Sequence, residues 1–207
     1  MRNVYIKICG ITNVEDALVA AHAGATAIGL IFAPISKRLV DQSTASAVVA
    51  ALPDSARAVG VFLGQDATEI YETAQAVGLE AVQVHGTNSV DEIQWLAQRI
   101  PVVVRAFSVH DVIAGLADGT GASQLFVDSS QPGSGETFDW DLLNGATWEK
   151  DYILAGGLDP DNVAEAISTL RPWGVDVASG VELTPGKKDH DKVRAFVARA
   201  VEAYQTR

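Results

Sequence analysis

Short runs rich in β-branched residues alternate with alanine-rich stretches along the whole chain. The short runs are typical of buried strands, and the longer stretches have the apolar spacing of helices that cover a sheet. The predicted strands span residues 4–8, 27–32, 57–62, 81–84, 102–107, 124–127, 152–155 and 175–178. The predicted helices span residues 14–23, 44–52, 67–77, 90–99, 109–116, 140–144, 162–170 and 189–205.

Several helix ends carry recognisable signals. Two helix starts have an Asp or Ser followed three residues later by Glu, which is a capping-box pattern: Asp66 with Glu69 and Ser89 with Glu92. A glycine in the left-handed conformation commonly ends a helix. Three glycines are predicted to have this role: Gly24, Gly78 and Gly174.

The strand–helix rhythm predicts the architecture. Eight strand–helix units in 207 residues favour a (β/α)8 TIM barrel of the α/β class. The alternative is a doubly wound open sheet, which usually has fewer strands and a glycine-rich fingerprint after the first strand; the segment Cys9-Gly10-Ile11-Thr12 does not supply one. No linker or low-complexity tract divides the chain, so residues 1–207 are predicted to form one domain. Its functional site is expected at the carboxyl ends of the strands.

Composition and charge narrow the function classes. Hydrophobic residues make up 48% of the chain and charged residues 20%, which is typical of a compact globular domain. No apolar run approaches the roughly 20 residues of a membrane span, and one cysteine cannot form an internal disulfide, so a cytoplasmic location is expected. The net charge of −11 argues against nucleic-acid and membrane partners. A phosphate ligand remains compatible with it, because backbone N–H groups bind anions locally.

Polar residues interrupt several of the apolar strands. Successive residues of a strand point to opposite faces, and the outer face of a barrel strand packs under helices, so these polar residues are expected to point inward. The set comprises Lys7, Cys9, Gln83, His85, Arg105, Asp128 and Asp176. Burying so many polar groups costs free energy unless they are paired, which indicates a functional site. An interior ion pair of Lys7 or Arg105 with Asp176 is the alternative interpretation of those three residues.

The segment Lys7-Ile8-Cys9-Gly10-Ile11-Thr12 resembles the opening motif of the phosphoribosylanthranilate isomerase family. Further segments similar to that family follow in order over essentially the whole chain. Among them are Val82-Gln83-Val84-His85-Gly86, Leu154-Ala155-Gly156-Gly157-Leu158 and residues 174–182. The resemblance implies an enzyme of tryptophan biosynthesis that performs an Amadori rearrangement by acid–base catalysis.

The resemblance also implies the catalytic pair. It assigns the general base to Cys9 and the general acid to Asp128, with neither a cofactor nor a metal. The thiol of Cys9 must be available as thiolate, although a free thiol has a pKa of about 8.5. Lys7, on the same face of the strand, is a candidate for lowering that pKa. Asp128 must be protonated in the reactive complex, which requires its pKa to rise above about 3.9.

The same resemblance implies the substrate-binding residues. Arg38 is expected to hold the anthranilate carboxylate, although a solvated loop charge is its alternative interpretation. The phosphate is expected on the loops after the seventh and eighth strands, at Gly156, Gly157, Ser179 and Gly180. Gln83, His85 and Asp176 are expected to line the substrate site, where His85 either forms the pocket wall or acts in catalysis. Ala178 replaces the first of two serines of the family, so the resemblance leaves one hydroxyl contact to the phosphate open.

Two other functions remain open at this point. Another sugar-phosphate isomerase or epimerase could share the phosphate loops, but it usually needs a metal cluster or a different acid–base pair. A barrel could also bind a phosphorylated ligand without turnover. The histidines show no metal-ligand spacing, and His22 and His190 are expected at the surface. The expected partner is a small phosphorylated amino sugar, and the chain is expected to be a monomer or a homodimer.

Overall fold

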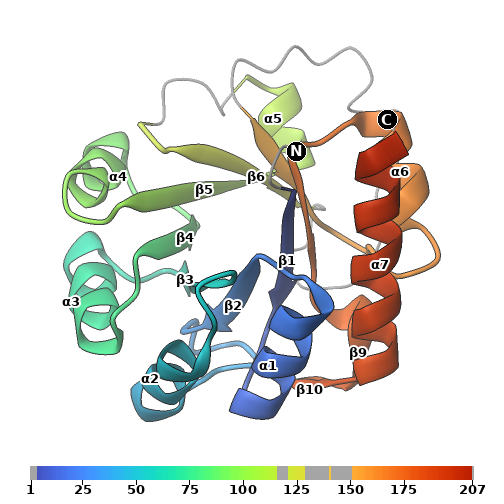
Figure 1. Cartoon of the computed structure of the whole chain (residues 1–207). Helices are drawn as coiled ribbons and strands as arrows, with labels where there is room; N and C mark the ends of the chain where they lie inside the picture. Colours follow the sequence, from blue (N-terminus) through green and yellow to red (C-terminus); the bar gives the residue numbers. More distant parts are fainter. Residues whose placement is uncertain (1–3, 116–120, 129–139, 141–150, 207) are drawn as a thin grey trace.

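A closed barrel of parallel strands forms the centre of the molecule (Figure 1). The computed structural model describes residues 4–115, 121–128, 140 and 151–206. The strands pair in chain order and β1 closes the ring with β8. They are β1 (Tyr5–Cys9), β2 (Ala27–Ile31), β3 (Arg57–Leu63), β4 (Ala81–His85), β5 (Val102–Ser108), β6 (Gln124–Asp128), β7 (Tyr152–Leu154) and β8 (Gly174–Val177). The closed ring confirms the (β/α)8 barrel and excludes the open sheet.

Helices surround the barrel and cover the outer faces of its strands (Figure 1). They are α1 (Val14–Ala23), α2 (Gln42–Ala51), α3 (Ala67–Val77), α4 (Val90–Ala97), α5 (Val109–Ile113), α6 (Val163–Leu170) and α7 (His190–Thr206). The long C-terminal helix α7 packs beside α1 and α6 and thereby joins the two ends of the chain (Figure 1). The helix predicted at 140–144 lies outside the described residues except for Trp140.

The predicted helix signals are largely confirmed. Both capping boxes form, and Gly24 and Gly78 end α1 and α3 in the left-handed conformation. The prediction for Gly174 is wrong, because Gly174 is the first residue of β8 and α6 ends instead at Arg171, whose φ is 49°. A Cβ on Gly174 would lie 2.7 Å from the ring of Tyr5 on the neighbouring strand. Close packing between strands therefore explains this glycine.

The side chains of the barrel form an outer layer under the helices and an inner layer within the ring. Phe126 and Ile153 belong to the inner layer. The inward orientation predicted for Arg105 is wrong, because its register partners Val84 and Leu125 both pack in the outer layer. The guanidinium of Arg105 donates to the carbonyl of Gly86 at 2.7 Å on the outer side of the sheet. Alternation defines two faces of a strand but does not say which face points inward.

A small hairpin that the sequence pattern did not predict follows β8. A short 3₁₀ turn, Ser179–Val181, leads into β9 (Glu182–Thr184), which pairs antiparallel with β10 (Lys187–Lys188). The hydroxyl of Thr12, after β1, donates to the carbonyl of Gly186 in the hairpin turn at 2.6 Å. The hairpin is thereby held against the carboxyl end of β1.

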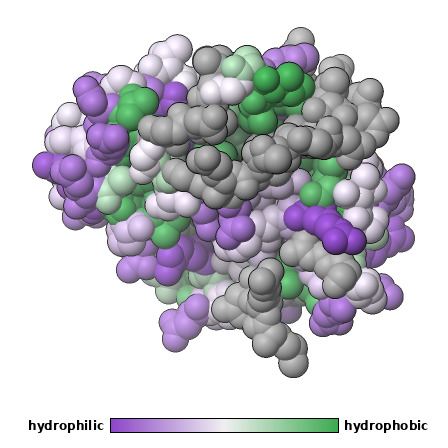
Figure 2. Space-filling model, turned by 90° about the horizontal axis from the view of Figure 1, so that it is seen from above, coloured by the Kyte–Doolittle hydropathy of each residue, from purple (hydrophilic) through white to green (hydrophobic). Residues whose placement is uncertain are grey.

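Apolar side chains on the viewed face of the molecule form separate patches among polar ones (Figure 2). Among the described residues, none of the helices has the length and apolar character needed to cross a membrane.

Candidate active site

A cavity of about 600 Å³ opens at the carboxyl ends of the strands. Most of the predicted site residues line it, namely Cys9, Arg38, Gln83, His85, Asp128, Asp176 and Ser179. Apolar side chains complete the wall, among them Ile31, Val61, Phe126 and Leu183. Because Cys9, His85 and Asp128 are the last residues of β1, β4 and β6, parallel pairing brings their side chains to the same end of the barrel.

Cys9 lies at the end of β1, opposite Gly29 on β2. Its side chain is buried, and a Cβ on Gly29 would lie 2.7 Å from Sγ of Cys9. Burial raises the pKa of the Cys9 thiol, and the nearby positive charges of Lys7 and Lys188 offset only part of this effect. The thiol is therefore the favoured form of Cys9 at neutral pH, and Lys7 does not bring its pKa below the ordinary range.

Lys7 and Asp176 form an ion pair inside the barrel. They are register partners on β1 and β8, and Nζ of Lys7 lies 2.6 Å from Oδ1 of Asp176. Burial lowers the pKa of Lys7, but the Asp176 carboxylate together with Cys9 and Tyr5 raises it by more, so the ammonium stays charged. The interior ion pair considered for these residues is therefore present, while Asp176 also lines the cavity.

Gln83 and His85 lie two residues apart on β4 and contact each other in the cavity wall. Nε2 of His85 is 2.7 Å from Nε2 of Gln83, and the His85 ring packs edge-on against Phe126. Burial and the positive charges of Lys7 and Arg105 lower the pKa of His85 to about 3. The imidazole is consequently neutral at pH 7.

Asp128 ends β6 and pairs in register with Ser108 on β5. Asp128 is 8% exposed and lines the cavity together with Phe126, which points to the same face of β6. The structure therefore places a second candidate proton-transfer group beside the cavity that also contains Cys9.

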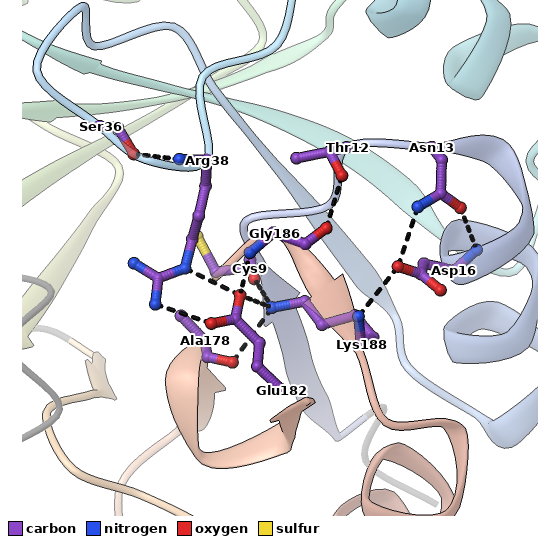
Figure 3. A network of polar contacts seen from close by, with 10 residues as sticks. All are labelled: Cys9, Thr12, Asn13, Asp16, Ser36, Arg38, Ala178, Glu182, Gly186 and Lys188. Atoms are coloured by element: carbon purple, nitrogen blue, oxygen red, sulfur yellow. Dashed lines mark hydrogen bonds and ion pairs between the residues drawn. The ribbon is translucent and has the colours of Figure 1, made fainter. Parts of the chain in front are cut away.

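Arg38 reaches the cavity from the loop after β2. This loop folds back on the strand through the bridge between Ile31 and Leu39, and Oγ of Ser36 accepts from the backbone N–H of Arg38 at 3.1 Å. The guanidinium of Arg38 faces the carboxylate of Glu182 in a two-point ion pair, with Nε and Nη2 each donating at 2.8 Å (Figure 3). Arg38 is thus fixed at the cavity by its ion pair with Glu182 and is not a solvated loop charge.

The sequence pattern missed Glu182 and Lys188 as members of the site. Nζ of Lys188 donates to Oε1 of Glu182 at 2.9 Å and to the backbone carbonyls of Cys9 and Ala178 (Figure 3). Burial raises the pKa of Glu182, but Arg38 and Lys188 lower it by more, so the carboxylate is charged. Both residues lie in segments similar to the family, and that similarity was the only sequence signal available for them.

The loops expected to hold a phosphate lie next to each other at the ends of β7 and β8. Gly156 and Gly157 have φ values of 86° and 66°, which favour glycine. A Cβ on Gly180 would overlap the carbonyl oxygen of Leu158, so the second loop packs tightly on the first. Ser179 lines the cavity, whereas the three glycines are not among its lining residues.

A second polar cluster lies behind the hairpin. Asp16 accepts from the backbone N–H of Lys188 at 3.0 Å and from Nδ2 of Asn13, and its Oδ1 lies 2.8 Å from Nε2 of His190. Burial raises the pKa of Asp16, but these hydrogen bonds lower it by more. The surface position expected for His190 is therefore only half right, because its side chain is 31% exposed and contacts the carboxylate of Asp16. Within the described ranges, no group of three or more His, Cys, Asp or Glu is arranged to hold a metal ion.

Comparison with known proteins gives consistent matches. The model of the family described as N-(5'phosphoribosyl)anthranilate (PRA) isomerase matches residues 6–199. A protein of that name from Acidithiobacillus ferrooxidans is 44% identical over 203 residues, covering 96% of this chain and 98% of the relative. The crystal structure of the Thermotoga maritima phosphoribosyl anthranilate isomerase superposes with a TM-score of 0.89 at 39% identity and covers 96% of this chain and 99% of its own.

A further solved structure contains a ligand. It is a phosphoribosyl anthranilate isomerase in complex with reduced 1-(o-carboxyphenylamino)-1-deoxyribulose 5-phosphate. It superposes with a TM-score of 0.85 at 38% identity, covering 96% of this chain and 99% of that one.

Proposed function

The chain belongs to the N-(5'-phosphoribosyl)anthranilate isomerase family, and we propose that its Cys9 and Asp128 carry out the proton transfers of the reaction. The enzyme converts N-(5'-phosphoribosyl)anthranilate into 1-(2-carboxyphenylamino)-1-deoxyribulose 5-phosphate, a step of tryptophan biosynthesis. Substrate and product are isomers, so the reaction requires proton transfers but no net oxidation.

Ring opening is the first step, and Asp128 acts in it as the acid. The carboxyl group donates a proton to the ring oxygen of the ribose while the bond between that oxygen and C1′ breaks. The nitrogen lone pair then forms a double bond to C1′, which gives a protonated Schiff base. A buried position at the cavity supports this role, because low solvent access favours the neutral carboxyl group that the step requires.

Proton abstraction from C2′ is the second step, and Cys9 acts in it as the base. The electron pair of the C2′–H bond forms a C1′–C2′ double bond, and the Schiff-base nitrogen becomes neutral. The resulting enolamine tautomerises to the ketone when its hydroxyl proton is lost and C1′ gains a proton. The positive charges of Lys7 and Lys188 near Cys9 stabilise the thiolate against the burial that disfavours it.

The two charged ends of the substrate are proposed to bind on opposite sides of this pair. Arg38 binds the anthranilate carboxylate, and the loops with Gly156, Gly157, Ser179 and Gly180 bind the phosphate. Gln83, neutral His85 and Asp176 line the space between these two ends. The ligand of the solved relative carries both a carboxyphenyl group and a phosphate, which supports a substrate with these two charged ends.

The observation that carries the proposal is that Cys9 and Asp128 line one cavity from different strands. The test follows the decay of substrate fluorescence with N-(5'-phosphoribosyl)anthranilate generated in place and chelator present. We expect Cys9→Ala and Asp128→Asn each to lower kcat by about 10²- to 10⁴-fold, because a proton-transfer group typically contributes a factor of this size. A folded variant that keeps the parental kcat would exclude the role assigned to that residue.

We also propose that residues 1–207 work as one catalytic domain in the cytoplasm, with a small phosphorylated amino sugar as partner. A dimeric phosphoribosylanthranilate isomerase is known from Thermotoga maritima. Sedimentation of the purified chain over a range of concentrations decides between the monomer and the homodimer.

A further inference from the structure

We propose that Glu182 is a positioning residue that turns Arg38 so that one edge of its guanidinium faces the carboxylate of the substrate. The inference deepens the proposed function, because it rests on Arg38 being the residue that binds this carboxylate. It assigns a reason to the buried ion pair between the hairpin and the loop after β2 (Figure 3).

The pairing geometry leaves a defined part of Arg38 available. A guanidinium carries five N–H donors in a planar fork. Glu182 takes the N–H of Nε and one N–H of Nη2, both at 2.8 Å. The edge formed by Nη1 and the second N–H of Nη2 is not used by Glu182. That edge can make a second two-point contact with a planar carboxylate, in the plane that Glu182 defines.

Glu182 is itself held on several sides, so it can define that plane. Its Oε1 accepts from Arg38, from Nζ of Lys188 at 2.9 Å and from the backbone N–H of Gly186 at 3.2 Å. Lys188 in turn donates to the carbonyls of Cys9 and Ala178. These contacts connect the orientation of Arg38 to the carboxyl ends of β1 and β8.

The path of the Arg38 side chain depends on Gly10. Gly10 has a φ of 73°, and a Cβ there would overlap Cδ of Arg38. The stem of Arg38 therefore lies across the residue that follows Cys9. This contact thereby fixes the position of Arg38, which binds the substrate carboxylate, relative to Cys9, the proposed base.

The local charge also favours a second carboxylate. Two cations, Arg38 and Lys188, flank the single anion of Glu182, so the group carries a net positive charge. Burial leaves this charge weakly screened. An unpaired Arg38 would attract an anion too, but its flexible side chain would have to lose more rotamer freedom on binding. Glu182 reduces that loss, because it already restricts the rotamers of Arg38. In turn, the Glu182 carboxylate competes to some extent with the substrate carboxylate for the guanidinium.

The test compares two ligands that differ only in the carboxylate. One is reduced 1-(o-carboxyphenylamino)-1-deoxyribulose 5-phosphate, and the other is the same compound with phenyl in place of carboxyphenyl. The ratio of their Kd values, measured by titration calorimetry, reports on the carboxylate contact alone. It does not depend on turnover, so it stays informative if the roles proposed for Cys9 and Asp128 fail.

Four variants are compared with the parent: Glu182→Gln, Arg38→Gln, the double variant, and Glu202→Gln as a control that removes an exposed carboxylate on α7. In the parent we expect the carboxylate to improve binding by about 10- to 100-fold, as for a charge-assisted hydrogen bond. Glu182→Gln should reduce this ratio by about tenfold, Arg38→Gln should abolish it, and Glu202→Gln should leave it unchanged. The double variant should equal Arg38→Gln, because Glu182 acts through Arg38.

Four results would overturn the inference. A parental ratio in folded Glu182→Gln would show that Arg38 is oriented without Glu182. A ratio in the double variant that differs from the ratio in Arg38→Gln would show that Glu182 acts on its own. If Glu182→Gln does not fold, Glu182→Asp keeps the charge but retracts the carboxylate, and an undiminished ratio there would also exclude a positioning role. A parent without any preference for the carboxylate ligand would refute the underlying assignment of Arg38.

Discussion

Gly29 leaves the space that the thiol of Cys9 occupies. The two residues are register partners on β2 and β1, and a Cβ on Gly29 would lie 2.7 Å from Sγ of Cys9. Because φ of Gly29 is not in the left-handed region, the absence of a side chain here serves packing rather than backbone conformation.

We therefore expect Gly29→Ala to displace the thiol and to lower kcat by about 10²-fold, as misplacing a reacting group by about 1 Å does. Steady-state kinetics on the folded variant checks this. Gly78→Ala is the matched control, because Gly78 ends α3 at φ 81° far from the cavity. It should lose about 1 kcal/mol of stability and keep its kcat. An unchanged kcat in Gly29→Ala would contradict the packing argument.

The pH profile of kcat/KM should report the raised pKa of Cys9. When a reaction needs one deprotonated base and one protonated acid, kcat/KM is flat between the two pKa values of the free enzyme and falls outside them. Burial raises the pKa of Cys9 above that of a free thiol, so the alkaline fall should begin at a higher pH than the titration of a free thiol. In Cys9→Ser this fall should disappear from the measurable range. A fall centred near pH 7 would show that another group is the base.

Removing one partner of the buried ion pair between Lys7 and Asp176 should strongly destabilise the fold. Asp176→Asn leaves an uncompensated ammonium in the barrel, so we expect a loss of about 3–5 kcal/mol in the free energy of unfolding. Denaturant titration measures it. Glu80→Gln is the control, because the exposed pair of Glu80 and Arg57, at 3.8 Å, should contribute only about 0–1 kcal/mol. Equal losses in both variants would contradict the difference in burial.

The stability that the Lys7–Asp176 pair contributes should decrease at alkaline pH. The pKa of Lys7 is raised in the folded state, so its contribution to stability is complete below its ordinary pKa of 10.5 and is lost as the pH rises through the folded value. We expect the parent to lose stability above pH 10.5 more steeply than Lys7→Met combined with Asp176→Leu. Parallel curves for the two proteins would exclude this linkage.

Glu182 should affect stability at acidic pH, whereas Lys7 affects it at alkaline pH. Its pKa is lowered in the folded state, so its contribution is complete above its ordinary pKa of 4.5 and is lost as the pH falls through the folded value. Urea unfolding at successive pH values below 4.5 should show a steeper decrease for the parent than for Glu182→Gln. Identical slopes would mean that Arg38 and Lys188 do not stabilise the charged carboxylate.

Much of the fold was predictable because it depends on local periodicity. The alternation of strand and helix, both capping boxes and the order of the eight strands follow from residues close together in sequence. Period-two alternation also placed Cys9 and Asp128 at strand ends on one face. The same rule failed for Arg105, because it defines two faces of a strand without saying which one the barrel encloses.

Contacts between distant segments were decided only by the tertiary structure. Arg38 and Glu182 are 144 positions apart, and Lys188 and Cys9 are 179 apart. No periodicity relates such positions, since closing the ring between β1 and β8 is what brings the end of the chain to its beginning. The sequence by itself therefore determined the barrel and that polar residues from several strands meet at its carboxyl end, although it missed Glu182 and Lys188. Burial and distance arise only once the barrel has closed. They decided the pairing of Lys7 with Asp176, the raised pKa of Cys9 and the ion pair of Arg38 with Glu182.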